Sequence, residues 1–404
     1  MSKILLTQIH IIRKNHRLYK YCDDICFRSK NLYNRTNYLL REEFINNGKI
    51  IFSNELNKQM KNEDCFKALP AKTSQLIIIQ LGNSWKSFFK GIKDWKNNKS
   101  KYCGMPKLPK YKAKNGRNIV LFDYMQGSFR DGKYYFPNRE RQKREYIETN
   151  IEKKNFKLLR IVPYGNCYKI EIVYEKEYDE KINFNDNYLG IDLGVNNFAT
   201  LVNNIGLQSI VINGRILKSI NQYYNKFNAQ AMSYIGKGSS NRIQRLATKR
   251  NNIFNTYLHR MSHWTINYCL ENNIGNIVIG RNKDWQRNVN IGRKNNQEFA
   301  QIPFEKFINQ LIYKGKLSGI NIQVIDEYHT SRASFLDQDI IIDKQENQIF
   351  SGKRKSRGLY KSKKNVIINA DVNAAYNILQ KCNPEVSWNN GIEGVSLHPV
   401  RVNI

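Results

Sequence analysis

The chain has 404 residues and a formal net charge of +32, from 66 Lys and Arg residues against 34 Asp and Glu residues. This excess of cations, with 12% aromatic residues, predicts a polyanionic partner. Neither an apolar run of roughly eighteen residues nor a secretory leader is found, which argues against a membrane partner and predicts an intracellular, cytoplasmic protein. The length predicts two to three domains.

The cysteines do not form a metal-ligand pattern. Only Cys22 and Cys26 are close in sequence, and their spacing is typical of one face of a helix. No second Cys pair or nearby His pair completes a set of four ligands. Neither a disulfide framework nor a zinc site is therefore expected.

The first part of the chain changes from strand to helix and back to strand. Residues 3–19 alternate between apolar and polar side chains, whereas a helical spacing follows over most of 21–115. Strand patterns separated by turn signals return between 117 and 178. We expect a β-barrel of the oligonucleotide-binding type into which a helical domain is inserted.

The end of the helical segment is strongly basic and carries interleaved aromatic rings. Cations can bind phosphates and rings can stack on bases, so this tract predicts nucleic-acid binding, although the solvated face of a helix has a similar composition. The cations expected to bind are Lys86, Lys90, Lys93, Lys96, Lys107, Lys110 and Lys112, and the rings include Trp85, Phe88 and Phe89.

From residue 188 onward the predicted order is strand, hairpin strand, long helix, strand, helix, strand, loop and helix. This is the order of the ribonuclease-H-like α/β fold. Its first strand presents one acid, Asp192, among apolar neighbours, and a second acid, Asp371, lies in the first turn of the last helix. Nucleases of this fold hold two divalent ions about 4 Å apart between carboxylates, so Asp192 and Asp371 are expected to be metal ligands.

Two further basic segments belong to this region. One face of the long helix is cationic, opposite an apolar stripe that predicts core packing. The segment 349–365 has several cations and no acid, and we expect it to be a loop that is mobile without nucleic acid. The cations expected to bind are Arg242, Arg245, Lys249, Lys353, Arg354 and Arg357.

The two acids lie in motif-like stretches. These read Gly190-Ile-Asp-Leu-Gly-Val-Asn-Asn-Phe-Ala-Thr and Asn369-Ala-Asp-Val-Asn-Ala-Ala-Tyr-Asn-Ile. They resemble the first and third RuvC motifs of TnpB, the transposon-encoded RNA-guided nucleases related to the compact type V CRISPR effectors. The resemblance covers about residues 1–381. It implies a guide RNA from the transposon end, double-stranded target DNA with a displaced strand and a short flanking motif, and a RuvC site that uses two Mg²⁺ ions, with Mn²⁺ as an alternative.

The resemblance also implies a division of the chain. The expected parts are a β-barrel (wedge) domain at 1–20 and 116–180, a helical recognition domain at 21–115, a RuvC nuclease domain at 186–327 and 366–382, a basic loop at 328–365, and a tail at 383–404.

Two features depart from the family. The basic loop replaces a zinc ribbon whose cysteines are absent, so no zinc is expected. The Glu that usually follows the strand of the second motif is replaced by Gly280. Candidates for the missing third acid are Asp284, Glu298, Glu305, Asp326 and Glu327.

Glu327 is the preferred third ligand. The strand before it should lie beside the strand that ends at Gly280, and active carboxylates gather at the carboxyl ends of such strands. Asp326 should point to the opposite face of a regular strand.

Two other readings of the same sequence stay open. In the first, the nuclease has lost its catalytic activity and the protein is an RNA-guided DNA-binding repressor. In the second, the protein is a transposase or resolvase that acts without RNA. Two polar residues are also left with alternatives. Arg332 is expected to contact the scissile phosphate or to form a structural salt bridge, and Asn373 to orient the metal ligands or to cap a helix.

Overall fold

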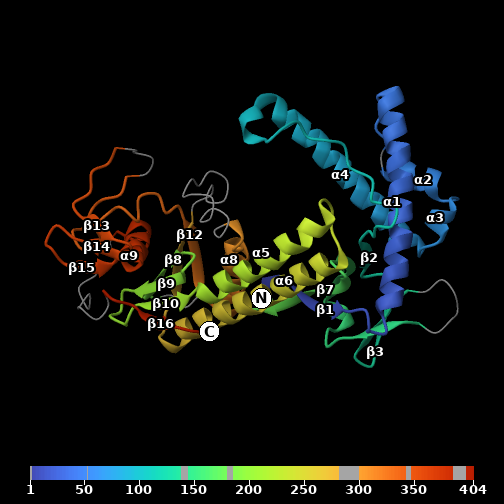
Figure 1. The fold of residues 1–404 in the computed structure, drawn as a ribbon. Helices are drawn as coiled ribbons and strands as arrows, with labels where there is room; N and C mark the ends of the chain where they lie inside the picture. The colour runs from blue at the N-terminus through green and yellow to red at the C-terminus, as the bar shows by residue number, and fades with distance from the viewer. Residues whose placement is uncertain are drawn as a thin grey trace. The chain divides into compact units, whose positions relative to one another are not determined.

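The computed structural model describes residues 2–51, 53–137, 144–179, 185–281, 300–342, 347–384 and 397–404. The chain forms two compact units, Lys3–Glu177 and Tyr178–Ile404, the second of which includes Ser2. We call them the N-terminal and C-terminal units (Figure 1). None of the described helices is long and apolar enough to cross a membrane.

The N-terminal unit contains helices and two sheets. Its elements are β1 (Ser2–Ile12), α1 (Tyr19–Asn47), α2 (Ser53–Met60), α3 (Asp64–Lys67), α4 (Ala71–Asn97), η1 (Lys99–Lys101), β2 (Val120–Asp123), β3 (Ser128–Arg130), β4 (Lys133–Tyr135), β5 (Tyr146–Glu148), η2 (Lys153–Asn155), β6 (Phe156–Tyr164) and β7 (Cys167–Tyr178). The larger sheet has the order β1-β7-β6-β2 and the smaller one β3-β4-β5. All four α-helices lie in the chain between β1 and β2, two strands of the same sheet. The closed barrel and the separate helical domain stay predictions.

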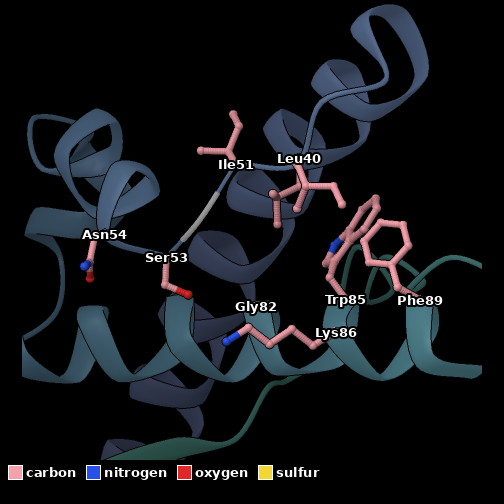
Figure 2. Close-up of a pocket in the computed structure, with 9 residues that line it drawn as sticks. Leu40, Ile51, Ser53, Asn54, Gly82, Trp85, Lys86 and Phe89 are labelled. Atoms are coloured by element: carbon pink, nitrogen blue, oxygen red, sulfur yellow. The ribbon is translucent and has the colours of Figure 1, made fainter.

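Trp85 of α4 belongs to the core of this unit, and Phe88 and Phe89 pack against that core. Trp85 is only 3% exposed, its Nε1 donates a hydrogen bond to Oδ1 of Asn37 at 3.0 Å, and its ring lies 5.6 Å from that of Phe44. Figure 2 shows Trp85 and Phe89 lining a pocket beside Leu40. The prediction that Trp85 stacks on bases is therefore wrong, because its ring is buried against protein.

The C-terminal unit is built on a six-stranded sheet. Its elements are β8 (Tyr188–Leu193), β9 (Asn197–Asn203), β10 (Ile210–Asn213), α5 (Arg215–Ile235), α6 (Asn241–Glu271), β11 (Asn276–Gly280), α8 (Phe304–Ser318), β12 (Asn321–Ile325), β13 (Lys353–Ser356), β14 (Leu359–Lys361), β15 (Ile367–Asn369), α9 (Ala370–Cys382) and β16 (Val400–Val402). The strand order is β12-β11-β8-β9-β10-β16. The strand and helix order predicted from residue 188 onward is confirmed except for the loop before the last helix, which contains β13, β14 and β15. The strand β16, which was not predicted, extends the sheet.

Helices cover both faces of this sheet. On one face, alternate residues of β8 such as Leu189 and Ile191 form a core with Phe254 and Leu258 of α6 and with residues of α8. On the other face, Val278 of β11 packs with residues of α9. Burial of these two apolar faces holds the carboxyl ends of β8, β11 and β12 beside α9.

Two glycines let α9 approach the sheet closely. A Cβ atom at Gly190 would lie 2.5 Å from Cγ of Leu379, and one at Gly280 would lie 2.4 Å from Cδ1 of Ile378. Real carbon atoms do not approach so closely, so any side chain at either position would push the helix away. Gly280 is therefore part of the packing of α9 as well as a departure from the family motif.

The basic segment is more ordered than its composition predicts. Strands β13, β14 and β15 form an antiparallel sheet, in which Arg354 pairs with Tyr360 and Tyr360 with Ile368. Tyr360 is 1% exposed and its hydroxyl donates to the carbonyl oxygen of Arg332 at 2.8 Å. The expectation of a loop at 349–365 is corrected, because the segment contains β13 and β14 and Tyr360 packs in a core with Ile368. Its mobility without nucleic acid stays a prediction.

Candidate active site

Three acids of the C-terminal unit lie at or just after the carboxyl ends of two strands and at the start of a helix. Asp192 is the fifth residue of β8, Glu327 follows the last residue of β12 by two positions, and Asp371 lies in the first turn of α9. The strands β8, β11 and β12 are parallel neighbours, so their carboxyl ends lie at one edge of the sheet. The prediction that the strand before Glu327 lies beside the strand that ends at Gly280 is confirmed.

The carboxylate of Glu327 lies over Gly280. A Cβ atom built on Gly280 would be 3.3 Å from Oε2 of Glu327, so this carboxylate lies where a side chain at position 280 would begin. Because β11 separates β12 from β8, Glu327 reaches toward Asp192 across the end of the strand that lacks its own acid. A glycine at position 280 leaves the space that this reach needs.

The three acids interact electrostatically. The pKa of Asp192 is raised well above its ordinary value of 3.8, mainly by burial and then by the charges of Glu327 and Asp371, while Arg354 opposes the shift. Carboxylates that share one site repel one another and resist ionising together. A divalent cation would relieve this repulsion.

The position of Asp371 is set by two asparagines. The side chain of Asn369 caps α9 and accepts hydrogen bonds from the backbone N–H groups of Asp371 and Val372. Nδ2 of Asn197 donates to Oδ2 of Asp371 at 2.6 Å. Asn197 was not among the residues predicted from the sequence, although it lies in the same motif as Asp192 and a polar residue at the start of a buried strand is a usable signal.

The donor set suits magnesium, which prefers carboxylate oxygens. The three acids supply hard oxygen ligands only, and their mutual repulsion indicates a deficit of positive charge at this edge of the sheet. Among the described residues, no group of three or more His, Cys, Asp or Glu side chains has an arrangement that could hold a metal ion as the side chains stand. The ligand roles of Asp192, Glu327 and Asp371 therefore remain proposals.

The other candidate acids have different surroundings. Asp326 is exposed and its Oδ1 accepts a hydrogen bond from the backbone N–H of Tyr328 at 2.9 Å. Glu305, in the first turn of α8, forms an ion pair with Arg281 at 2.6 Å. Asp284 and Glu298 lie outside the described residues.

Asn373 forms hydrogen bonds with the segment that precedes the sheet of β13, β14 and β15, which we call the basic sheet, and Arg332 belongs to that segment. Oδ1 of Asn373 accepts from the backbone N–H of Phe335 at 3.0 Å, and its Nδ2 donates to the carbonyl of Ala333 at 2.7 Å. Asn373 thus fixes this segment to α9, and the cap of α9 is Asn369. The guanidinium of Arg332 is exposed and lies 5.7 Å from the centre of the Phe350 ring.

The cations predicted to bind nucleic acid are all at the surface. Lys86, Lys90, Lys93, Lys96, Lys107, Lys110, Lys112, Arg242, Arg245, Lys249, Lys353, Arg354 and Arg357 are exposed. Arg354 is distinguished from the others because it is near enough to Asp192 to affect its pKa. Their contacts with nucleic acid stay predictions.

Two family models match the C-terminal half of the chain. The model for OrfB of IS605, described as a probable transposase, matches residues 171–286 and includes the whole of β8 with Asp192. The model for the TNB domain of Cas12f1-like proteins matches residues 304–378 and includes Glu327 and Asp371. No curated protein matches the chain significantly.

Several solved structures match the chain, and the first of them is similar to it in fold. A Cas12f1–sgRNA–target DNA complex has a TM-score of 0.50 at 16% identity, over 89% of this chain and 82% of that one. A CRISPR-Cas12f ternary complex has a TM-score of 0.37 at 15% identity, over 91% and 82%. The mini-RNA-guided endonuclease CRISPR-Cas_phi3 has a TM-score of 0.42 at 10% identity, over 99% and 94%.

The two family models fall on the segments that carry the three acids, and the first of these structures shares the overall fold. Together with the two RuvC-like motifs, the two family matches support a TnpB-like protein of the compact type V effector kind.

Proposed function

We propose that the protein is an RNA-guided DNA endonuclease of a transposable element. It would bind a guide RNA from the transposon end and cut matched double-stranded DNA beside a short flanking motif. The observation that carries the proposal is the grouping of three acids at the carboxyl edge of the sheet, where Glu327 and Asp371 act electrostatically on Asp192. The Cas12f1 complex of similar fold contains an sgRNA and a target DNA, which supports these partners.

The three acids would hold two Mg²⁺ ions, or Mn²⁺ ions in their place. Bound magnesium would supply an activated water and stabilise the charge on the attacking and leaving oxygens. Glu327 would take the role of the acid that is absent at position 280, since its carboxylate lies over that residue. Relocation keeps a carboxylate near Asp192 without displacing α9.

The cations would bind and orient the nucleic acid. Arg354 lies on the basic sheet and acts on the charge of Asp192, so its guanidinium is suited to hold a phosphate that enters the site. The exposed cations of α4 and α6 would bind backbone phosphates farther along the guide and target strands. Base pairing with the guide, rather than these side chains, would select the sequence.

The test is guided cleavage. Protein produced with its transposon-end RNA should retain RNA of defined sequence and cut a matched plasmid in Mg²⁺. Asp192→Ala and Asp371→Ala should each abolish cleavage and leave target binding intact. Cleavage without RNA would indicate a transposase or resolvase and contradict the proposal.

One observation favours a second candidate function. The acid of the second motif is absent at Gly280, as it would be in a decayed nuclease that acts as an RNA-guided repressor. Against this, the Asp192 and Asp371 motifs are intact, and Glu327 lies over the altered position. Tight guided binding by the wild type with no cleavage in Mg²⁺ or Mn²⁺ would favour the repressor.

A further inference from the structure

The side chain of Asn197 joins two parts of the C-terminal unit. Its Nδ2 donates to Oδ2 of Asp371 at 2.6 Å, and its Oδ1 accepts from a guanidinium N–H of Arg401 at 3.3 Å. The two contacts use opposite ends of one amide. Asp371 belongs to the first turn of α9, whereas Arg401 belongs to β16.

Arg401 and Asp371 require the same orientation of this amide, and Arg401 holds it from the opposite end. An amide side chain can rotate by half a turn and exchange its oxygen with its NH₂ group. A guanidinium has only donors, so it requires the amide oxygen on its own side. The NH₂ group of Asn197 must then point to the carboxylate, whereas the opposite orientation would set an oxygen against the charge of Asp371.

The backbone around these residues is held in place. Arg401 lies opposite Val211 in the parallel pairing of β16 with β10. Nδ2 of Asn213 donates to Oδ1 of Asn403 at 2.8 Å, and the N–H of Val400 donates to the carbonyl of Ser209 at 2.9 Å. The position of Arg401 is therefore determined by the edge of the sheet.

We propose that Asn197 and Arg401 are positioning residues of the nuclease site, in which Arg401 orients the amide of Asn197 and this amide fixes the rotation of the Asp371 carboxylate. The backbone of Asp371 is already set by the cap at Asn369, so the remaining freedom is that of its side chain. The inference rests on the proposed function. It assigns β16 a role in the site that neither RuvC-like motif contains.

Loss of a residue that holds a metal ligand in place by a hydrogen bond typically weakens metal binding or activity by about ten- to a hundredfold. Asn197→Ala and Arg401→Met should therefore weaken Mn²⁺ binding to the full-length, RNA-free protein by that factor in a calorimetric titration. They should also raise the Mg²⁺ concentration for half-maximal cleavage, with unchanged affinity for target DNA. Arg401→Lys keeps a hydrogen-bond donor at this position and should therefore retain most of the Mn²⁺ affinity that Arg401→Met loses.

The double variant separates positioning from other roles. If Arg401 acts through Asn197, Asn197→Ala with Arg401→Met is no worse than Asn197→Ala alone. If the two substitutions weaken Mn²⁺ binding independently, so that their effects multiply, the proposed action of Arg401 through Asn197 is overturned, because Arg401 would then act on DNA or on the fold. Thermal unfolding near that of the wild type establishes that each variant is folded.

Failure of this inference differs from failure of the proposed function. If Asp371→Ala loses Mn²⁺ binding and cleavage while Asn197→Ala keeps both, only the inference is overturned. If the wild type neither binds Mn²⁺ nor cleaves guided DNA, the proposed function is overturned together with it.

Discussion

At the scale of single residues, Asp192 occupies a position that is unfavourable without a cation. Burial and the charges of Glu327 and Asp371 raise its pKa above the ordinary value of 3.8. Between 3.8 and the raised pKa, the folded protein binds a proton that the unfolded chain releases, so this group's contribution to stability falls as pH rises through that window. The site is therefore less stable in its ionised, metal-free form.

This linkage predicts how an amide at position 192 behaves. In metal-free buffer, Asp192→Asn should unfold at a higher temperature than the wild type at neutral pH, because the amide removes the repulsion. The difference should shrink as the pH falls through the raised pKa of Asp192 toward 3.8, because the carboxyl of the folded wild type is then protonated. Calorimetric unfolding across this pH range is the measurement, with Asp326→Asn as an exposed control. Identical pH profiles for wild type and Asp192→Asn would contradict the assigned environment.

Gly280 allows a second prediction at this scale. Gly280→Ala should destabilise the protein by about 1–3 kcal/mol, because its Cβ would lie 2.4 Å from Cδ1 of Ile378. Adding Ile378→Val removes that methyl group and should recover part of the loss in thermal unfolding. Gly104→Ala is the control, since a Cβ there meets no atom within 4 Å. Equal stability of Gly280→Ala and the wild type would refute the close packing of α9.

The sequence allowed prediction of the acids more readily than of their partners. Asp192 and Asp371 lie in motifs, and Glu327 follows from the rule that parallel strands meet at their carboxyl ends. Asn197, the first residue of β9, contacts Asp371 of α9, and Arg401 comes from a strand that is distant in sequence. Such contacts depend on side-chain geometry that no periodicity encodes.

At the scale of elements, the strands with a clear apolar pattern were predicted from the sequence, and some of the short strands were not. The large sheet of the C-terminal unit follows from buried runs such as 276–279. By contrast, β13 reads Lys-Arg-Lys-Ser and is exposed at every position, and β16 has only three residues. Both form through pairing with neighbours, which a local pattern does not report.

Hydrogen bonds of two acids hold the segment between β12 and β15 together. Asp339 accepts from the backbone N–H of Ser334 at 2.8 Å and from Oγ of Ser351 at 2.6 Å. Asp337 accepts from Oγ of Ser334 at 2.6 Å and from the N–H of Lys363 at 2.7 Å. Together they link three separate stretches of the chain, as a metal ion would.

Asp339→Ala should therefore loosen the basic sheet. Loss of hydrogen bonds to a charged group is expected to cost about 1.5–3 kcal/mol of local stability. Amide hydrogen exchange of residues 350–363 in the RNA-free protein should accelerate, while exchange in β8 and β9 stays unchanged. Asp179→Ala, at an exposed position, is the control. Unchanged exchange in 350–363 would show that packing of Tyr360 alone orders this sheet.

At the scale of the whole molecule, the net charge of +32 makes the affinity for nucleic acid strongly dependent on salt. Each phosphate that a cation neutralises releases counterions, so affinity falls steeply as salt rises. The exposed cations lie on α4, on the segment between η1 and β2, on α6 and on the basic sheet, so both units contribute to this field.

The basic face of α6 can be tested through the salt dependence. Replacing Arg242, Arg245 and Lys249 together by Ala should reduce the slope of log affinity for guide RNA against log salt by about 2–3, at roughly 0.7–0.9 for each phosphate contact. The control keeps the charge by exchanging Arg and Lys at the same three positions. An unchanged slope in the Ala variant would remove α6 from the interface.

The central claim concerns the third acid, and it is tested most directly by a pair of adjacent substitutions. Glu327→Gln and Asp326→Asn each remove one negative charge from neighbouring positions, of which only Glu327 lies over Gly280. We expect Glu327→Gln to lower the single-turnover rate of guided, Mg²⁺-dependent DNA cleavage by about a hundredfold or more, beyond the effect of an outer contact. Target binding should be unchanged, and Asp326→Asn should cleave as the wild type does. Retained cleavage in Glu327→Gln, or loss of cleavage in Asp326→Asn alone, would contradict the account.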